Sequence, residues 1–456
     1  MSDKSTFSIA EFGRIYSEED FNNDQLPESS LETVFLPARA FENLRNFIAE
    51  NQDESIGTEQ SFSVHRSKGR DFIRVKNYVG VIETRDGTIL EVLPKIYRST
   101  TEREEQHLEE TRRIFLRMLR CLRDSPFVSI DNAHLKSCRF PILEVFISVF
   151  LAEMDKLVKQ GIRRHYISTE GNEMFLKGRL VFARQMQENL IHPERFYVSY
   201  DVFDSNIPQN RLIKSSLLKL AQTSRSIRNQ NLIRQFLFIL ADIPESTDHV
   251  RDFSESQSGQ SRLLEGYTQL LKWARVFLLN ESFTNFKGTH HNKAILFPME
   301  RIFEDYVSYG FRCYADAYDV SIQDHVHHLV QKHNGASKFA LRPDIVLRDQ
   351  RNRSSTIIDC KWKLINAGEI GKNYNISQSD MYQLYAYGKK YVMYRCEKLI
   401  LLYPKSETFT TPLTPFYYEI VEDRCLQLFV VPFDLNCDLE TSVNEVMQYQ
   451  EIQSSV

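Results

Sequence analysis

Two aspartates and a lysine in the last third of the chain have the residue types and spacing of a site for a divalent cation. Asp344 precedes one apolar stretch and Asp359 lies toward the end of the next, with a polar segment between them. If both stretches are neighbouring antiparallel strands, the carboxylates lie near the same end of a hairpin and can converge on one cation. Lys361 follows Asp359 by two residues, so both project from one strand face. Cys360 and Trp362 then point the other way, into packing.

Such a group of side chains fits the hydrolysis of a phosphodiester bond. This reaction requires neutralisation of the phosphate charge and a nucleophilic water. Carboxylate oxygens hold Mg²⁺, which polarises the phosphate and lowers the pKa of a bound water. An ammonium such as that of Lys361 can orient the water and stabilise developing negative charge. Pro343 restricts the backbone before Asp344 and can leave this carboxylate at an edge. We therefore expect Mg²⁺ as the cofactor, with Mn²⁺ as an alternative.

The order Pro343-Asp344 followed by Asp359-Cys360-Lys361 resembles the PD-(D/E)xK nuclease motif. The short pattern also occurs by chance, and the alternative is an exposed hairpin with flanking surface carboxylates and a solvated Lys361. Both halves of the pattern lie on predicted strands, with one predicted helix before them and another after them. This context favours the nuclease interpretation.

The resemblance implies one further contribution to the site from each flanking helix. Nucleases of this type often use a glutamate of the first helix as a metal ligand, and Glu304 is the candidate here. Gln383 and Tyr387 are four residues apart on the second helix, on the face that would border the metal. The alternatives are a solvated or ion-paired Glu304, a solvated Gln383 and a core Tyr387. The predicted catalytic residues are Asp344, Asp359, Lys361, Glu304 and Gln383, with Asp344, Asp359 and Glu304 as metal ligands.

The composition is that of a globular chain with ordinary charge. With 456 residues, 42% of them hydrophobic and 26% charged, the chain is long enough for about three domains. The formal net charge is −4, whereas a protein that wraps nucleic acid unaided usually has a basic excess. We therefore expect this chain alone to bind DNA poorly. No apolar stretch is long enough to span a bilayer, and the seven cysteines contain no CxxC pair, which fits the cytoplasm.

The remaining sequence predicts a multidomain α+β protein. Residues 1–60 have weak periodicity, whereas residues 71–97 combine β-branched and aromatic runs around a turn at Arg85-Asp86-Gly87, which is typical of a hairpin. The Ser- and Gln-rich segment 253–262 is a linker candidate or an exposed loop of a helical domain. Helical periodicity is found in four stretches, which are 101–125, 141–161, 210–224 and 263–280.

The last third of the chain predicts a mixed sheet with helices packed on it. Helices are expected at 298–318 and 377–395, strands at 320–331, 341–347, 356–362 and 398–403, and a hairpin at 417–433. We expect three domains. They are a β-rich N-terminal domain at 1–100, a mainly helical middle domain at 101–285 and, from the motif resemblance, a restriction-endonuclease-like α/β domain at 286–456.

Several ordered stretches resemble the McrC family, the nuclease subunits of McrBC modification-dependent restriction systems. The resemblance spans roughly residues 75–390 and does not extend convincingly to residues 1–60 or beyond about 405. The stretches are 78–97 with its Leu93-Pro94-Lys95-Ile96 ending, 150–180 with Gly161 and Lys177-Gly178-Arg179, 194–217 with Tyr200-Asp201 and Asn210-Arg211-Leu212-Ile213-Lys214, and Asp380–Gly388.

The McrC resemblance implies a two-part machine. In this family, a McrB-like AAA+ GTPase ring recognises DNA and translocates on it. The McrC-like subunit docks on the ring through its N-terminal part, stimulates GTP hydrolysis and cuts the DNA. The implied partners are this ring and double-stranded DNA whose modified cytosine the ring recognises, with no membrane. This chain has no GxxxxGK[ST] phosphate loop, so the NTPase must be another chain.

Two other functions stay open. The chain could be an adaptor that activates an AAA+ NTPase without cutting, although an intact PD and DxK pattern disfavours this. It could also be a free-standing PD-(D/E)xK nuclease that needs no partner. Only basic residues are candidates for contacting the GTPase sites of the ring. For each of them, a solvated surface charge is the default interpretation. They are Arg85, Lys95, Lys177 and Arg179.

A cluster of four histidines in residues 324–333 suggests zinc at first sight. No convincing third and fourth ligand follows at the standard spacing of a zinc site. We therefore expect a structural or surface role for these histidines.

Overall fold

The chain divides into two compact units in the computed structural model. Unit 1 comprises Met1–Arg139 and Ser282–Val456, and unit 2 comprises Phe140–Glu281. The structure describes residues 6–21, 27–50, 61–67, 69–96, 104–123, 125–131, 139–257, 265–279, 293–349, 351, 354–391, 395–421 and 424–451.

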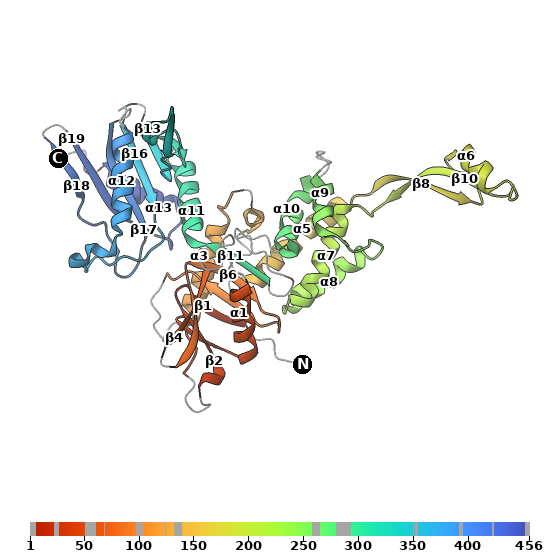
Figure 1. Ribbon diagram of the computed structural model, residues 1–456, viewed down its shortest axis with the longest axis horizontal. Coiled ribbons are helices and arrows are strands. Elements are labelled where there is room, and N and C mark those ends of the chain that lie inside the picture. The colour runs from red at the N-terminus through yellow and green to blue at the C-terminus, as the bar shows by residue number, and fades with distance from the viewer. Residues whose placement is uncertain are drawn as a thin grey trace. The chain divides into compact units, whose positions relative to one another are not determined.

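This division differs from three consecutive domains because distant segments pair with one another. The strand β11 (Lys293–Pro298) is antiparallel to β6 (Tyr78–Glu83), so the chain after residue 292 returns to the N-terminal part (Figure 1). The helix α3 (Glu104–Leu119), expected in the middle domain, packs on β7 (Ile89–Leu93) and on α11 (Met299–Tyr314). Residues 104–119 and 293–298 therefore both belong to unit 1.

Two four-stranded sheets form the N-terminal part of unit 1. One has the order β1-β7-β6-β11 and the other the order β3-β2-β5-β4. Both sheets and α1 share an apolar core that includes Ile9, Leu44, Ile73 and Leu90. The remaining bounds are β1 (Thr6–Ala10), β2 (Arg14–Ser17), β3 (Thr33–Leu36), α1 (Ala38–Glu50), β4 (Phe62–Ser67) and β5 (Arg70–Val75), with 3-10 turns η1 (Glu18–Asp20) and η4 (Pro126–Ser129).

The described part of residues 1–60 contains strands and a helix that the weak periodicity of this segment did not predict. Three strands and α1 lie within this segment, and β1 pairs in parallel with β7, more than eighty residues away. Strands of four or five residues are too short for a clear alternation, and their pairing partners are non-local. The predicted hairpin is confirmed for β6 and β7, which are antiparallel and joined by a turn in which Gly87 has a φ of 83°.

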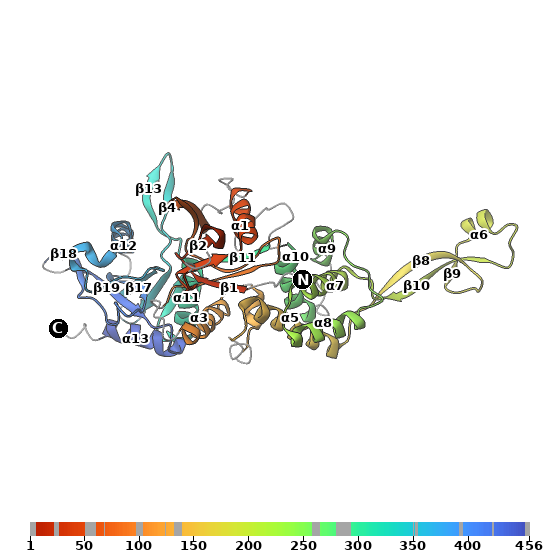
Figure 2. The same ribbon diagram turned by 90° about the horizontal axis from the view of Figure 1, so that it is seen from below.

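A six-stranded mixed sheet forms the C-terminal part of unit 1. Its order is β12-β15-β16-β17-β19-β18, with β16, β17 and β19 parallel and the other neighbours antiparallel. A separate two-stranded hairpin stands out from it (Figure 2). The bounds are β12 (Asp319–Ile322), β13 (His328–His333), β14 (Ala336–Ala340), β15 (Ile345–Asp349), β16 (Ser354–Cys360), η6 (Ile370–Asn375), α12 (Gln378–Lys390), β17 (Arg395–Pro404), β18 (Phe416–Val421), β19 (Arg424–Phe433) and α13 (Leu439–Glu451).

Helices cover both faces of this sheet, and the sequence had predicted a mixed sheet with helices packed on it. On one face, Val346 and Ile357 share an apolar core with Leu384 and Tyr387 of α12. On the other, Phe433 of β19 packs edge-on against Phe303 of α11, with ring centroids 6.0 Å apart, and α11 also packs on α13. Because strand side chains alternate between faces, this arrangement decides which helix each active-site candidate meets.

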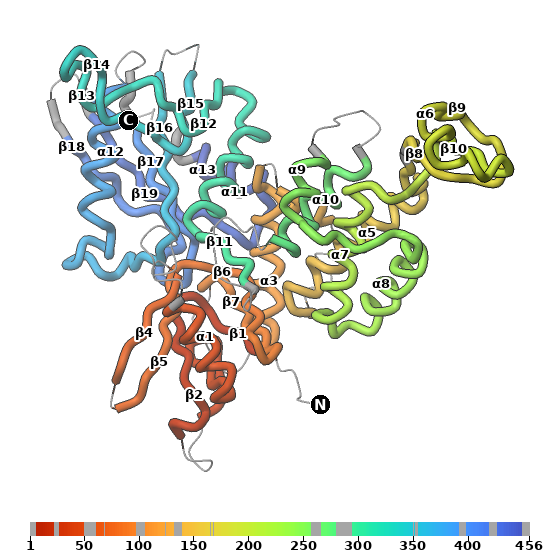
Figure 3. Tube along the Cα trace, turned by 45° about the vertical axis from the view of Figure 1, so that its right-hand side comes forward, coloured from red at the N-terminus to blue at the C-terminus, as the bar shows by residue number. Residues whose placement is uncertain are grey.

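Unit 2 combines a helical bundle with a long hairpin. The helices α5, α7, α8, α9 and α10 lie together (Figure 3), and the hairpin of β8 and β10 leaves them and carries α6 near its far end (Figure 1). The hairpin was not anticipated in a segment expected to be mainly helical. The bounds are α5 (Ile142–Gln160), β8 (His165–Glu173), β9 (Arg179–Leu180), α6 (Phe182–Glu188), β10 (Phe196–Asp204), α7 (Pro208–Thr223), α8 (Ile227–Ile239), α9 (His249–Gln257) and α10 (Glu265–Leu279).

The helix boundaries in unit 2 follow local sequence signals. The helix α5 begins after Pro141 and ends at Gly161, whose φ of 96° is a backbone conformation that favours glycine. The linker candidate at 253–262 is helical in its first half, as part of α9, and its residues 258–262 lie outside the described residues. No helix in the described part of the chain is long and apolar enough to cross a membrane.

Candidate functional site

Asp344 and Asp359 lie opposite each other at one end of two neighbouring strands. β15 is antiparallel to β16 with Ile345 opposite Ile358, so the next positions outward are the two aspartates. Each aspartate is two residues from an apolar side chain that packs against α12, so both carboxylates project toward the α12 face of the sheet. The antiparallel pairing on which the expected convergence of the two carboxylates depends is observed.

Lys361 lies beside Asp359 on the same face. Its Nζ is 2.6 Å from Oδ2 of Asp359. Cys360 and Trp362 project the other way and are buried, as expected from the alternation. The Trp362 ring packs against Phe303 of α11, with ring centroids 5.5 Å apart. The end of β16, which carries Asp359, and the segment just after it, which carries Lys361, are therefore anchored by packing on the opposite face.

Burial favours the neutral form of the carboxyl groups in this site. The Asp359 side chain is 1% exposed, and its Oδ1 accepts no hydrogen bond from any described residue. Burial raises the pKa of Asp359, and the charge of Lys361 offsets this only in part. Burial and then the charges of Asp359 and Glu304 raise the pKa of Asp344 well above its usual value. The buried carboxylate of Asp359 beside the half-buried one of Asp344 favours a bound cation.

The ammonium of Lys361 stays charged in this environment. Burial alone would disfavour the charged form, but the adjacent Asp359 carboxylate raises the pKa of Lys361 above its ordinary value. The Oδ2 atom of Asp344 accepts a hydrogen bond of 2.7 Å from the backbone N–H of Cys360, which joins the ends of the two strands. The site thus combines two carboxylates of opposing strands with a fixed positive charge.

Glu304 approaches this group from α11 but makes its own contact. Its Oε1 accepts a hydrogen bond of 2.7 Å from Nε2 of Gln323. Burial raises the pKa of Glu304, and the nearby charge of Lys361 lowers it in part. Glu300, one helical turn earlier in α11, is exposed and accepts a hydrogen bond of 3.1 Å from Asn77. Glu304 therefore lies within electrostatic reach of the site.

The donor set fits Mg²⁺ that keeps part of its hydration shell. Within the described ranges, no three His, Cys, Asp or Glu side chains form a ready-made metal-binding group, so Glu304 is not gathered with the two aspartates as a third ligand. Mg²⁺ commonly keeps several waters and binds through one or two carboxylates together with substrate phosphate. Asp344 and Asp359 supply two carboxylates, and the unsatisfied Oδ1 of Asp359 is a free acceptor among the residues described.

Gln383 contacts the site through Tyr387. Its Nε2 donates a hydrogen bond of 2.6 Å to the Tyr387 hydroxyl, which donates one of 3.0 Å to the backbone carbonyl of Arg342. Tyr387 is 3% exposed, so it also packs in the core. The two residues thus hold the segment that ends at Asp344, and a direct catalytic role for Gln383 stays a prediction.

Tyr387→Phe is expected to lower the free energy of unfolding by about 1–2 kcal/mol, because the Arg342 carbonyl and the Gln383 amide each lose a partner. Chemical denaturation of the full-length protein measures this loss. The matched control is Tyr382→Phe on the same helix, where the side chain is 66% exposed, and here the change should stay within about 0.5 kcal/mol. Equal effects of the two substitutions would contradict the positioning role of Tyr387.

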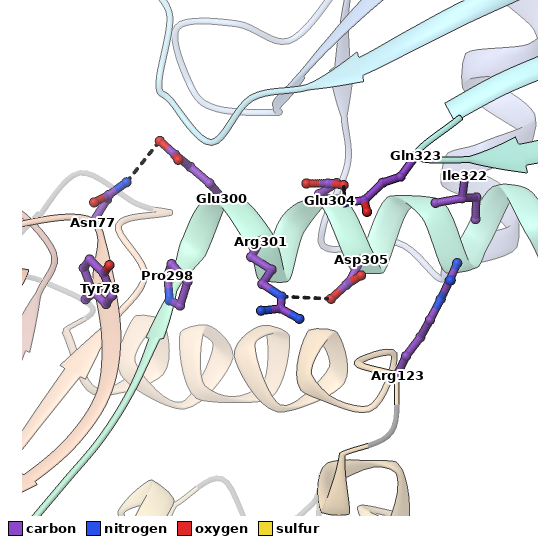
Figure 4. A pocket seen from close by; sticks show the side chains of 10 residues that line it. All are labelled: Asn77, Tyr78, Arg123, Pro298, Glu300, Arg301, Glu304, Asp305, Ile322 and Gln323. Atoms are coloured by element: carbon purple, nitrogen blue, oxygen red, sulfur yellow. Dashed lines mark hydrogen bonds and ion pairs between the residues drawn. The ribbon is translucent and has the colours of Figure 1, made fainter. Parts of the chain in front are cut away.

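A cavity of about 860 Å³ lies beside α11. Figure 4 shows Glu304 and Gln323 at one end of it and Asn77 with Glu300 at the other. Asp344, Asp359 and Lys361 are not among its lining residues. Its charged lining consists of three acidic and two basic side chains, which are Glu300, Glu304, Asp305, Arg123 and Arg301. This mixture of charges does not match a phosphate group.

A buried glutamate of the N-terminal part contacts the segment just after β16, next to Lys361. Oε1 of Glu11 accepts hydrogen bonds from Nε1 of Trp362 at 2.6 Å and from the backbone N–H of Lys95 at 2.9 Å. Glu11 is 1% exposed, and burial raises its pKa to about 7. Sequence reasoning missed this contact because the two side chains are about 350 positions apart and nothing local marks either of them.

Residues 73–404, well over half of the chain, match the family described as McrBC 5-methylcytosine restriction system component. The chain belongs to this family. The resemblance to McrC-type chains predicted from the motifs is thereby confirmed. No curated protein matches the sequence.

Two solved structures from Thermococcus gammatolerans are similar to this McrBC family chain. One is a chain of a refined half-complex from a tetradecameric assembly of McrB AAA+ hexamers with bound McrC, with 16% identity and a TM-score of 0.70. The alignment covers 97% of this chain and 100% of that one. The other is a chain of the McrBC complex determined by cryo-EM, with 18% identity, a TM-score of 0.49 and coverages of 67% and 86%. The first similarity shows a shared mixed α/β fold.

The family-like residues of unit 2 have structural roles in this McrBC family chain. Asn210 donates hydrogen bonds to the carbonyls of Arg163 and Ser205, and Arg211 pairs with Asp252 at 2.5 Å. In the hairpin, Nζ of Lys177 lies 3.1 Å from Glu173 and 3.9 Å from the centroid of the Tyr200 ring. At Gly178, with a φ of 67°, a Cβ atom would lie 2.4 Å from the carbonyl oxygen of Ser199, which explains the glycine.

Proposed function

We propose that this chain is the Mg²⁺-dependent DNA endonuclease subunit of a McrBC-like restriction system. It would hydrolyse phosphodiester bonds of double-stranded DNA when a McrB-like AAA+ GTPase ring activates it. The observation that carries the proposal is the group of Asp344, Asp359 and Lys361 at one end of two adjacent strands. Family membership and the C-terminal mixed sheet with helices on both faces support a restriction-endonuclease-like domain of the PD-(D/E)xK type.

Each residue of the group has a distinct task in this proposal. Asp344 and Asp359 would hold Mg²⁺ or Mn²⁺, with Glu304 assisting from α11. The cation would polarise the phosphate and lower the pKa of an attacking water. Lys361, kept protonated by Asp359, orients that water and stabilises negative charge that develops on the phosphate. Gln383 and Tyr387 hold the backbone before Asp344 in position.

The proposed partner is an AAA+ GTPase ring whose GTP hydrolysis this chain stimulates. The similar Thermococcus gammatolerans assembly is described as McrB AAA+ hexamers with bound McrC, which supports a partner of this kind. The family description supports a DNA substrate that contains modified cytosine, and the ring would recognise this base. A role in restriction supports the cytoplasm as the location of this protein. The docking role of residues 1–100 stays a prediction.

The far end of the unit 2 hairpin is a second candidate for the partner surface. Its large apolar side chains are exposed to a degree that is unusual outside interfaces. They are Met174 (67%), Phe175 (81%), Leu176 (62%), Phe182 (74%), Met186 (64%), Leu190 (71%) and Ile191 (85%). These seven residues are called the hairpin tip below. A ring subunit that bound the hairpin tip would bury the apolar surface that these side chains expose, and this burial would stabilise the complex.

Replacing Phe175 and Ile191 together by serine is expected to weaken binding to the ring roughly a hundredfold, because large buried side chains dominate interface energies. The fold should be unaffected, since both side chains are exposed. Biolayer interferometry with the AAA+ partner measures the affinity. The control is Ile227→Ser, which removes an 80% exposed side chain from α8 instead. Unchanged affinity in the double variant would remove the hairpin tip from the partner surface.

Co-purification from the native host tests the assembly. We expect an AAA+ protein to co-elute with the full-length chain, and the complex to cut methylated DNA in the presence of Mg²⁺ and GTP. Unmethylated DNA is the matched substrate and should be cut much less. Stimulated GTP hydrolysis without any cleavage would favour the non-cleaving adaptor. Cleavage by the purified chain alone would favour a free-standing nuclease.

A further inference from the structure

The hairpin of β13 and β14 stands apart from both neighbouring sheets. Its two strands pair only with each other in the described part of the chain. The turn at Asn334-Gly335 has positive φ at both positions, which suits a tight two-residue connection. All residues from 331 to 340 are exposed. Figure 2 shows the hairpin projecting away from the strands β17 and β19.

This hairpin is basic in a chain whose net charge is −4. Residues 325–342 include three Lys and Arg, four His and no Asp or Glu. Lys332 and Lys338 are exposed on the strands, and Arg342 is exposed at the base, two residues before Asp344. Among the described residues, none of these three cations has an ion-pair partner. The positive charge is therefore available to an external anion.

The pairing places His328 and Lys338 on one face of the hairpin and Leu329 and Phe339 on the other. His328 is opposite Ala340 and Val330 is opposite Lys338, so His328 and Lys338 share one face. Leu329 and Phe339 then lie opposite each other on the other face, 45% and 73% exposed. Phe339 has a φ of 57°, a conformation that is strained for a bulky aromatic residue. An exposed and strained aromatic side chain contributes nothing evident to the folded core.

The base of the hairpin is fixed next to the proposed active site. The backbone N–H of Leu341 donates to the carbonyl of His327 at 2.8 Å, and the His327 ring lies 4.3 Å from that of Tyr391. Just after β14, the carbonyl of Arg342 accepts a hydrogen bond from the Tyr387 hydroxyl of α12. β14 thus ends four residues before Asp344, and hydrogen bonds hold the base of the hairpin beside that segment.

We propose that the hairpin of β13 and β14 is a DNA-binding arm that contacts the duplex beside the phosphate to be cut. Lys332, Lys338 and Arg342 contact backbone phosphates, and Leu329 with Phe339 enters the adjacent groove. This inference rests on the proposed function, because it assumes that DNA reaches Asp344 and Asp359. It adds a binding element to that function and gives the negatively charged chain a local basic surface for DNA.

The dimensions and the charge both favour duplex DNA over a protein as the occupant. Six strand residues extend roughly 20 Å, at about 3.4 Å per residue, and a two-stranded ribbon fits the major groove, which is about 12 Å wide. A basic surface without any carboxylate matches a phosphate backbone. Apolar side chains that enter a groove are a known means of holding DNA.

Photo-crosslinking of the full-length chain tests this contact directly. Phe339→p-benzoylphenylalanine, assembled with the AAA+ partner and an end-labelled duplex in Ca²⁺ without Mg²⁺, is expected to crosslink to DNA upon irradiation. The matched control is Tyr417→p-benzoylphenylalanine, where the replaced aromatic side chain is 52% exposed. It lies on β18, which is the edge strand of the six-stranded sheet opposite β12, and we expect no DNA crosslink from it. A crosslink from position 339 to the AAA+ protein, or none to DNA, would overturn the proposal.

Charge removal gives an independent measurement. The double variant Lys332→Gln and Lys338→Gln is expected to lower the affinity of the assembled complex for DNA at least tenfold at low salt, and to reduce the salt dependence of binding by about one unit per lost phosphate contact. Arg351→Gln, an exposed cation at the opposite end of β15 and β16, should leave both quantities unchanged. Equal behaviour of the two variants would overturn the proposal.

The two hypotheses fail in different ways. If Asp359→Asn still cuts DNA while position 339 crosslinks to it, the catalytic assignment is wrong and the arm stands. If Asp359→Asn is inactive while position 339 does not crosslink, the arm is wrong and the catalytic assignment stands. Thermal unfolding of each hairpin variant should match the unsubstituted chain, because the substituted side chains are exposed.

Discussion

Asp359→Asn is expected to abolish DNA cleavage by the assembled complex, with a loss in kcat of at least about a thousandfold. The carboxylate lies at the end of β16, faces Asp344 and holds Lys361 at 2.6 Å. The amide carries no charge, so it weakens the binding of a divalent cation and lets Lys361 lose its fixed partner. Cleavage of methylated duplex in Mg²⁺ and GTP, followed over time, measures the effect.

The fold and the partner contact should survive this substitution. Oδ1 of Asp359 has no hydrogen-bond partner in the described part of the chain, and burial disfavours its charge. We therefore expect no fall in thermal stability and unchanged binding to the AAA+ protein. Asp349→Asn, at the opposite end of the same two strands, is the matched control and should cut normally. Undiminished cleavage by the Asp359 variant would remove the proposed catalytic site.

The free energy of unfolding is expected to fall by roughly 3 kcal/mol between about pH 4.5 and pH 7 because of Glu11. Its pKa is raised from 4.5 to about 7 in the folded chain, mainly by burial, and a tenfold change in an acid dissociation constant corresponds to about 1.4 kcal/mol. Between these two pKa values the folded state binds more protons than the unfolded state. This contribution to stability is therefore complete below pH 4.5 and is lost as the pH rises through 7.

Glu11→Gln should remove this part of the pH dependence. Urea denaturation of both proteins from pH 4.5 to pH 8 gives the difference, in which the contributions of other groups cancel. The control is Glu32→Gln, whose side chain is 52% exposed and pairs with Lys95 on the surface, and its profile should be parallel to that of the unsubstituted chain. A parallel profile for Glu11→Gln would show that burial does not raise the pKa of Glu11 as stated.

The contact of Glu11 also bears on the active-site strand. Glu11 accepts a hydrogen bond from Trp362, the residue next to Lys361. One buried hydrogen bond therefore connects the residue that follows β1 to the segment that follows β16. In the proposed function, residues 1–100 include the predicted docking region, so this bond lies on a direct structural connection between docking and catalysis.

The core of the candidate site was predictable because it is local in sequence. Asp344 immediately precedes β15, Asp359 lies in the next strand, and Lys361 is two residues from Asp359. Strand alternation and antiparallel pairing alone place these three side chains on one face. The bounds of α5 were equally local, since Pro141 and Gly161 mark its ends. The roles of Glu304 and Gln383 came from resemblance, and their described contacts are with Gln323 and Tyr387.

Only the tertiary structure decided which distant segments lie together. The sequence by itself determined the carboxylate pair, the spacing of the lysine and most helices, because strand and helix periods are properties of neighbouring residues. It did not reveal that β11 joins β6, that Glu11 binds Trp362 or that residues 165–204 form a hairpin with an apolar tip. Such contacts depend on surfaces that exist only after the chain has folded, and an exposed apolar residue has the same local sequence signal as a buried one.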